Sequence, residues 1–165
     1  MKTVSVCFVC LGNICRSPTA EAVMRRLADE AKLADRILID SAGTGDWHIG
    51  APPDERAQYA ARQRGYALDA LRGRQITAAD FARFDLLVAM DERNVAALHR
   101  LCPPGQRDKI RLLMEFVPDA DDRWTGTREV ADPYFGGADG FELVLDQCEA
   151  ACRGLIAALR AQVLK

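Results

Sequence analysis

Short apolar segments alternate with helix-like segments, and this alternation restricts the fold of the chain more than any other feature. Four apolar runs have the length of buried strands, at residues 4–10, 37–40, 84–90 and 110–114. Segments with apolar residues at helical spacing follow them, at residues 18–33, 54–64 and 91–101 and along a final helix. This order predicts a parallel sheet with helices on both faces. The 165 residues suit one domain with its own core.

Turn-forming and capping residues mark the ends of these elements. Ser17-Pro18 predicts an N-cap followed by the first helical residue, and Gly65 closes the helix that ends at residue 64. Glycine and proline make residues 43–53 and 117–140 loops. The final helix carries an apolar stripe that includes Cys148 and Cys152, so we expect both thiols in the core.

Composition excludes several classes of function. The net charge is −2 and the charged residues of both signs are mixed, so we expect neither a nucleic-acid nor a membrane partner. No apolar run approaches the roughly 20 residues that span a bilayer. The first strand begins without a signal-peptide pattern, which predicts a cytoplasmic protein with free cysteines. The sequence carries no indication of oligomeric state.

The segment from Cys7 to Ser17 has three chemical interpretations. Cys7 and Cys10 form a C-x-x-C pair, but residues three apart on a strand point to opposite faces. His48 and His99 lack ligand spacing, so we expect no metal, and Cys7 is predicted to be a small buried residue. A nucleotide P-loop needs a second glycine and a lysine, which are absent.

The third interpretation is an anion-binding loop around a nucleophile. Parallel sheets bind ligands at the carboxyl ends of their strands, where Cys10 lies. Backbone N–H groups that lead into a helix converge on an anion, and Gly12 permits the unusual backbone angles that such loops use. Arg16 can donate two hydrogen bonds to an oxyanion, and the Ser17 hydroxyl can stabilise a thiolate. These residues suit phosphoryl transfer through a thiol, although the spacing alone also permits an inert turn.

The segment "CLGNICRSP" at residues 10–18 resembles the signature of the low-molecular-weight protein tyrosine phosphatases. Further similar segments follow in the family's order, over nearly the whole chain: Ser41-Ala42-Gly43-Thr44, Asp46-Trp47, Arg74-Gln75-Ile76, Phe84-Asp85, Met90-Asp91-Glu92 and Asp132-Pro133-Tyr134. The resemblance implies a single flavodoxin-like domain over residues 1–165. It would be a three-layer α/β/α domain around a twisted, doubly wound four-stranded parallel sheet of order 2-1-3-4.

The resemblance also implies a role for each residue of the site. Cys10 would be the nucleophile, Arg16 the phosphate ligand and Asp132 the general acid and base, with no metal or cofactor. Asn13 would brace the loop, and Cys15 would form a reversible disulfide with Cys10. Trp47 and Tyr134 would wall a slot for phosphotyrosine in a protein or peptide, and inorganic phosphate would be the product. The expected substrate-binding residues are Leu11, Gly12, Asn13, Ile14, Cys15, Ser17, Trp47 and Tyr134.

Three other functions stay open from the sequence. A protein-arginine phosphatase typically has threonine where this chain has Ile14. A thioredoxin-coupled arsenate reductase needs further reactive cysteines, for which Cys102 is the remaining candidate beside Cys148 and Cys152. A non-catalytic phosphopeptide-binding module would be expected to lack Cys10, Arg16 or Asp132. The chain departs from the family pattern at Leu71, where many relatives have histidine, and at Phe135, where eukaryotic members often have a second tyrosine.

Overall fold

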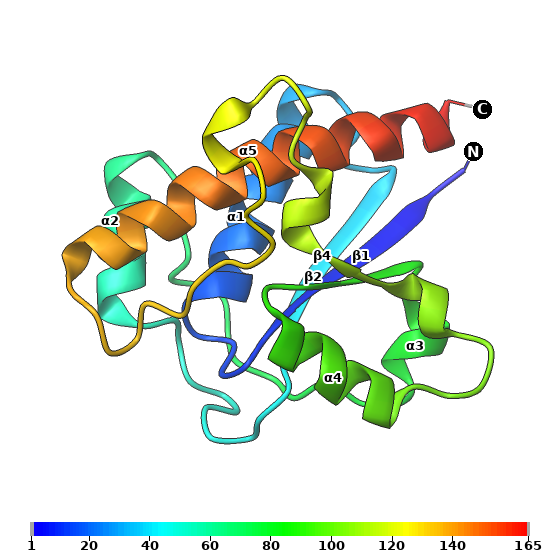
Figure 1. The fold of residues 1–165 in the computed structure, drawn as a ribbon, viewed down its shortest axis with the longest axis horizontal. Coiled ribbons are helices and arrows are strands. Elements are labelled where there is room, and N and C mark those ends of the chain that lie inside the picture. The colour runs from blue at the N-terminus through cyan, green and yellow to red at the C-terminus, as the bar shows by residue number, and fades with distance from the viewer. Residues whose placement is uncertain (1, 165) are drawn as a thin grey trace.

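A computed structural model describes residues 2–164 as a parallel sheet between two layers of helices (Figure 1). The strands are β1 (Val4–Cys10), β2 (Ile37–Gly43), β3 (Leu86–Ala89) and β4 (Ile110–Leu112), in the order β2-β1-β3-β4. All three strand pairs are parallel. The predicted flavodoxin-like order and the α/β class are therefore confirmed. None of the helices within residues 2–164 is long and apolar enough to cross a membrane.

The helices differ from the predicted set mainly at their ends and in short additional turns. The α-helices are α1 (Arg16–Glu30), α2 (Glu55–Gln63), α3 (Asp80–Arg83), α4 (Glu92–Leu101) and α5 (Ala138–Val163). Three single-turn 3₁₀ helices accompany them: η1 (Arg107–Lys109), η2 (Leu113–Phe116) and η3 (Asp122–Trp124). The short helices α3, η1 and η3 have too few residues for a periodic apolar pattern, so the sequence did not predict them.

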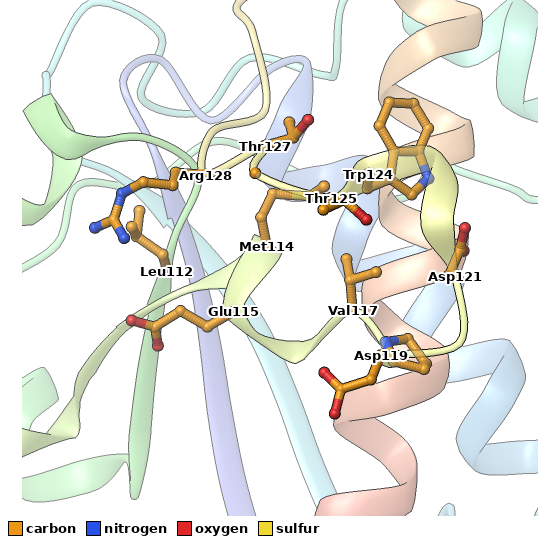
Figure 2. A pocket seen from close by; sticks show the side chains of 12 residues that line it. Leu112, Met114, Glu115, Val117, Asp119, Asp121, Trp124, Thr125, Thr127 and Arg128 are labelled. Atoms are coloured by element: carbon orange, nitrogen blue, oxygen red, sulfur yellow. The ribbon is translucent and has the colours of Figure 1, made fainter.

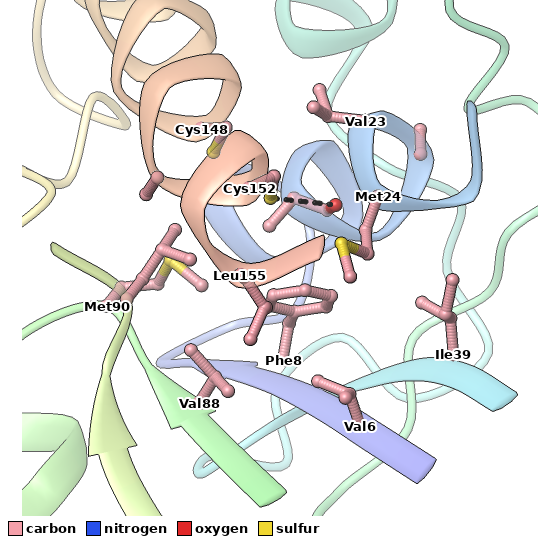
Figure 3. Packing of buried hydrophobic residues seen from close by; sticks show 14 of the residues in the cluster. Val6, Phe8, Val23, Met24, Ile39, Val88, Met90, Cys148, Cys152 and Leu155 are labelled. Atoms are coloured by element: carbon pink, nitrogen blue, oxygen red, sulfur yellow. Dashed lines mark hydrogen bonds between the residues drawn. The ribbon is translucent and has the colours of Figure 1, made fainter. Parts of the chain in front are cut away.

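Side chains of β1 alternate between two cores. Val6, Phe8 and Cys10 belong to the core beneath α1 and α5, where Phe8 faces Leu155 and Met24 (Figure 3). Cys7 and Val9 belong to the core on the other face, with residues of α3 and α4. This alternation confirms that Cys7 and Cys10 point to opposite faces and that Cys7 is buried.

The final helix packs closely on this first core. Cys148 and Cys152 are fully buried, as the apolar stripe predicts. Gly154 lies so close to the Phe116 carbonyl of η2 that an added Cβ would clash with it. Alanine at this position would therefore force α5 away from η2.

Four predicted elements, three strands and one helix, have wrong boundaries. β2 continues past Asp40 to Gly43, because Ser41, Ala42 and Gly43 pair with Phe8, Val9 and Cys10 of the buried strand β1. β3 and β4 are shorter than predicted, and residues 113 and 114 turn into η2. α1 ends at Glu30 because Lys32 has a left-handed backbone with φ 60°.

The start of α1 is the most informative correction. The helix begins at Arg16, and Ser17 is not its N-cap. Cys15 occupies the N-cap position without a side-chain capping bond. The Ser17 hydroxyl lies inside the protein and contacts the Cys10 thiol instead. Helix α1 therefore begins directly from the loop that carries the predicted anion site.

Candidate active site

The Cys10 loop, residues 10–17, connects the end of β1 to α1 and surrounds the Cys10 sulfur. Cys10 Sγ lies 3.0 Å from Ser17 Oγ, and the Asn13 backbone N–H donates to Cys10 Sγ at 3.3 Å. The Asn13 N–H is therefore a donor to the sulfur, and the Ser17 hydroxyl lies within hydrogen-bond distance of it.

The backbone of the Cys10 loop offers further donors to an anion. Within residues 2–164, the N–H groups of residues 14–17 have no hydrogen-bond acceptor in the protein. They are the N–H groups at the N-terminus of α1, where the helix dipole is positive. The loop therefore leaves backbone donors available at the place where the sequence predicts an anion site.

Asn13, and not Gly12, adopts the unusual backbone conformation in this loop. Asn13 has φ 57°, whereas Gly12 is outside the left-handed region, so the expected role of Gly12 is wrong. A Cβ on Gly12 would lie 3.2 Å from Cδ2 of His48, so glycine here permits a close approach of His48. Asparagine tolerates the left-handed region better than most residues do.

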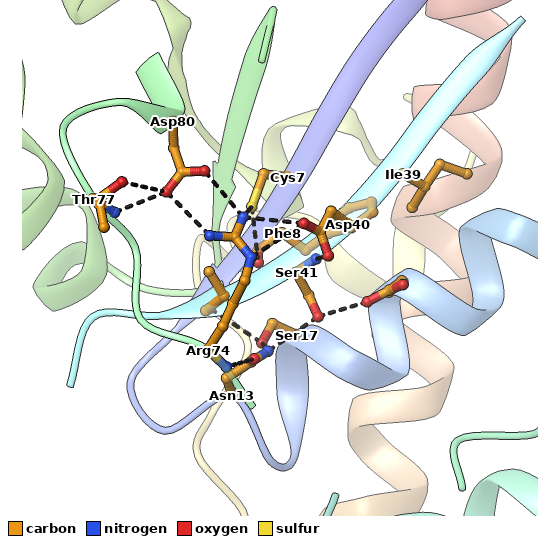
Figure 4. A network of polar contacts seen from close by, with 12 residues as sticks. Cys7, Phe8, Asn13, Ser17, Ile39, Asp40, Ser41, Arg74, Thr77 and Asp80 are labelled. Carbon is orange, nitrogen blue, oxygen red and sulfur yellow. Dashed lines mark hydrogen bonds and ion pairs between the residues drawn. The ribbon is translucent and has the colours of Figure 1, made fainter. Parts of the chain in front are cut away.

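The Asn13 side chain braces the loop from inside (Figure 4). Its Nδ2 donates to Ser17 Oγ at 2.8 Å and to Ser41 Oγ at 3.0 Å, and its Oδ1 accepts from the Arg74 backbone N–H at 3.1 Å. Ser41 in turn donates to the buried carboxylate of Glu21 at 2.6 Å. These hydrogen bonds connect the loop to β2 and α1 and to the segment around Arg74.

Arg74 carries its own ion pairs on the opposite side of this network. Its guanidinium lies 3.1 Å from Asp80 and 3.1 Å from Asp40, and both pairs are drawn in Figure 4. Burial raises the pKa of Asp80, but hydrogen bonds from Arg74 and Thr77 outweigh this effect and hold the pKa below its usual value. The sequence predicted no role for Arg74 beyond its place in a family landmark.

Arg16 is a buried cation, only 2% exposed, at the mouth of the Cys10 loop. Its Nη1 donates to Asp91 Oδ2 at 2.7 Å and to the Val130 carbonyl at 2.9 Å, and its Nη2 lies 3.7 Å from Asp132 Oδ2. Burial opposes the charge, but Cys10 and Asp91 raise the Arg16 pKa overall, so the guanidinium stays protonated. Arg16 therefore brings the predicted nucleophile and the predicted acid into one charged cluster.

Asp91 was missed as a site residue by the sequence analysis. It follows the buried strand β3, so it lies at the same carboxyl edge of the sheet as Cys10. Its second oxygen caps α4 by accepting from the Asn94 N–H at 2.8 Å. Its position directly after a predicted strand was the sequence feature that could have indicated Asp91 as a site residue.

Most of the predicted substrate-binding residues line one cavity of about 230 Å³. Its lining consists of Cys10, Leu11, Gly12, Ile14, Cys15, Arg16, Trp47, His48, Asp132, Tyr134 and Phe135. Asn13 and Ser17 lie behind this lining, where they brace the loop. His48 and Phe135 are wall residues that the sequence analysis did not assign to the site.

The walls of this cavity are aromatic and open to solvent. Trp47 is 68% exposed and Phe135 is 96% exposed, and the Phe135 ring meets the Tyr134 ring edge to face at 4.9 Å. Cys15 is buried beneath the opening, and burial raises the pKa of its thiol well above the usual range. Cys15 is therefore a neutral thiol in the lining of the cavity that also contains Cys10.

A larger cavity, of about 390 Å³, lies on another part of the molecule, between β4, η2 and η3 (Figure 2). Trp124, Glu115 and Asp119 are among the side chains around it. None of the predicted site residues lines this cavity. The candidate active site is therefore identified by the combination of Cys10, Arg16 and Asp132 in the smaller cavity, and not by cavity size.

Comparisons with known proteins agree with this site. A family model described as low molecular weight phosphotyrosine protein phosphatase matches residues 5–165. A low molecular weight protein-tyrosine-phosphatase of Streptomyces coelicolor is 48% identical over 163 residues, which are 98% of this chain and 96% of the relative. The low molecular weight phosphotyrosine protein phosphatase of Sus scrofa is 42% identical over 160 residues, 96% of this chain and 97% of the relative.

Solved structures show the same similarity in three dimensions. A protein tyrosine phosphatase from Entamoeba histolytica with Hepes in its active site is 39% identical, with a TM-score of 0.90 over 97% of this chain and 99% of that one. YfkJ from Bacillus subtilis is 38% identical, with a TM-score of 0.88 over 98% of each chain. With the family model, these matches establish that the chain belongs to the low molecular weight protein-tyrosine-phosphatase family.

Proposed function

We propose that this chain hydrolyses phosphotyrosine in protein or peptide substrates through a phosphorylated Cys10. The observation that carries the proposal is the meeting of Cys10, Arg16 and Asp132 in one cavity at the carboxyl edge of the sheet. A thiolate, a fixed cation and a carboxylate are the groups that cysteine-dependent phosphate-ester hydrolysis needs. The family of the chain supports the same reaction class.

In the first step, the Cys10 thiolate attacks phosphorus in line with the tyrosyl oxygen. The S–P bond forms as the P–O bond breaks, and Asp132 donates its proton to the leaving oxygen. General acid catalysis of this kind contributes roughly 10²–10⁴-fold. Arg16 and the N–H groups of residues 14–17 bind the phosphoryl oxygens, where the transition-state charge resides.

In the second step, a water molecule attacks the phosphorus of the cysteinyl phosphate. The ionised Asp132 carboxylate takes the proton of this water as the S–P bond breaks. Inorganic phosphate leaves and the Cys10 thiolate is regenerated. Apart from the attacking water, the groups that act in these two steps belong to the chain.

The cavity walls support a preference for an aromatic phosphate ester. Trp47 and Tyr134 line the same cavity as Cys10, where they can contact a phenyl ring. Ile14 adds an apolar contact that suits tyrosine better than the polar guanidinium of phosphoarginine. Cys148 and Cys152 are buried in the core, which argues against their use in an arsenate reductase relay.

The redox role of Cys15 stays a prediction. Hydrogen peroxide would oxidise the Cys10 thiolate to a sulfenic acid, and the Cys15 thiol would condense with it to a disulfide and release water. If this occurs, wild-type enzyme inactivated by peroxide recovers fully with a thiol, and Cys15→Ala does not. Full recovery of Cys15→Ala would contradict the proposal.

We also propose a cytoplasmic location, which the six free cysteines support.

The test is an assay of purified protein on a phosphotyrosine peptide, a phosphoserine peptide and a phosphoarginine protein, without added metal. We expect turnover of phosphotyrosine that Cys10→Ser abolishes and that the matched control Cys102→Ser retains. Cleavage of phosphoarginine in preference to phosphotyrosine would refute the proposed specificity. Binding of all three without turnover would refute the enzymatic role itself.

A further inference from the structure

Arg56, at the start of α2, contacts the segment that carries Asp132. Its Nη2 donates to the Tyr134 carbonyl at 2.9 Å. The Tyr134 N–H in turn donates to Asp132 Oδ1 at 3.1 Å. One residue therefore connects Arg56 to the carboxylate that we assign as the general acid.

The Arg56 side chain is itself held in place on three sides. Asp54 accepts two hydrogen bonds from its guanidinium, from Nε at 3.1 Å and from Nη2 at 2.9 Å. The guanidinium also lies 4.8 Å from the centre of the Phe141 ring and 5.5 Å from that of Tyr134. The hydrogen bonds from Arg56 also hold the Asp54 pKa below its usual value. A guanidinium fixed by a fork and two rings is a defined anchor and not a freely rotating surface group.

The anchor is joined to the Cys10 loop. The Asp54 backbone N–H donates to the Ile14 carbonyl at 2.8 Å. A continuous path therefore runs from Ile14 through Asp54 and Arg56 to Tyr134 and Asp132. This path fixes the position of the acid relative to the loop that holds the nucleophile.

The segment that carries Asp132, residues 131–137, makes few hydrogen bonds or ion pairs with the rest of the protein. Residues 131–137 are exposed except for Pro133, and two glycines end the segment. Within residues 2–164, Arg56 provides the one side-chain hydrogen bond to residues 131–137 from another element, and Arg16 the one ion pair. The ion pair is long, at 3.7 Å, and it constrains the carboxylate without fixing the backbone.

We infer that Arg56 is a positioning residue that holds Asp132 for proton transfer to the leaving group. The inference rests on the proposed function, because it requires Asp132 to act as the acid. Arg56 does not line the cavity and does not touch the phosphate site. Loss of the Arg56 side chain is therefore expected to lower kcat/KM most for substrates whose leaving group needs a proton.

The experiment compares kcat/KM for phenyl phosphate, a poor leaving group, and para-nitrophenyl phosphate, a good one. We expect Arg56→Ala to lose on the order of tenfold on phenyl phosphate, less than the ~10²-fold that a 1 Å misplacement can cost. On para-nitrophenyl phosphate we expect little loss. Arg62→Ala, an exposed arginine on the same helix, is the matched control. Arg56→Lys is expected to give an intermediate loss, because an ammonium group lacks the planar fork.

A double-mutant cycle with Asp132→Ala decides whether Arg56 acts through the acid. If it does, Arg56→Ala adds no further loss on phenyl phosphate in the Asp132→Ala background. Equal loss on both substrates, or no loss on either, would overturn the role of Arg56 while leaving the acid in place. An Asp132→Ala enzyme with wild-type activity on phenyl phosphate would instead overturn the acid assignment, a distinct result. Thermal melting of Arg56→Ala and Arg56→Lys shows whether each variant is folded.

Discussion

Substitution of Asp91 separates two tasks that its carboxylate performs at once. One oxygen caps α4 by accepting from Asn94 N at 2.8 Å, and the other pairs with buried Arg16 at 2.7 Å. Asparagine caps helices about as well as aspartate, so Asp91→Asn keeps the cap and loses the charge. Alanine loses both functions.

The magnitudes follow from the two contacts. A hydrogen bond to a charged group contributes about 1.5–3 kcal/mol, which is the expected destabilisation of Asp91→Asn. Loss of an N-cap costs a further ~0.5–2 kcal/mol, so Asp91→Ala is expected to lose about 2–5 kcal/mol in total. Arg16 is buried, at 2% exposed, and Asp91 is partly buried, at 19% exposed, so solvent replaces the pair poorly.

Urea denaturation with and without inorganic phosphate measures these differences. Phosphate should restore part of the lost stability in both variants, because its oxygens give Arg16 a new anionic partner. Glu129→Gln is the control, since this exposed carboxylate accepts from the Glu92 N–H at the same helix N-terminus and does not pair with Arg16. Wild-type stability of Asp91→Asn, or equal losses in the Asn and Ala variants, would refute the separation of the two tasks.

Three other changes test the packing and the network around the site. Asn13→Ala should lower the free energy of unfolding by about 3 kcal/mol, roughly 1 kcal/mol for each hydrogen bond that Asn13 makes to Ser17, Ser41 and Arg74. It should also lower kcat/KM. An unchanged urea midpoint would contradict the predicted loss of stability. Gly154→Ala should cost about 1–3 kcal/mol by pushing α5 off the Phe116 carbonyl. Gly136→Ala, whose added Cβ would meet only the Pro133 carbonyl at 3.6 Å, should be close to neutral in the same melt. The Asp80 pKa is lowered in the folded protein, so its stabilisation is present above the unfolded value of about 4 and is lost as the pH falls through the folded value. Asp80→Asn should therefore reduce the acid dependence of stability, and Asp119→Asn, at an exposed position, should not.

The fold was predictable from local pattern because each central strand is a continuous apolar run. The run from Val4 to Cys10 is buried on both faces, as is typical of strands in a parallel sheet. The end of β2 was not predictable in this way, because Ser41 and Gly43 have low strand propensity. Their pairing with β1 overrides that propensity.

The site was predictable where its residues lie together in the chain and not where they meet only in space. Cys10 and Arg16 belong to one loop, so their spacing in the sequence was enough to predict a nucleophile beside an anion-binding arginine. Asp91 and Arg56 act through partners more than 70 residues away, at separations of 75 and 78 residues. Ser17 was predicted to be an N-cap because serine is favoured at that position. Its hydroxyl contacts the Cys10 thiol instead, and Cys15 occupies the N-cap position.

The central claim, that hydrolysis passes through a phosphorylated Cys10, is tested most directly by trapping the intermediate. A phosphotyrosine peptide is mixed with the enzyme, the reaction is quenched in acid within milliseconds, and the protein is digested and mapped by mass spectrometry. We predict one phosphoryl group on the peptide that contains Cys10, and none in the Cys10→Ser variant. If Asp132→Ala slows hydrolysis of the cysteinyl phosphate more than its formation, the trapped fraction is larger in that variant. Continued turnover by Cys10→Ser, or a phosphoryl group on another residue, would contradict the claim.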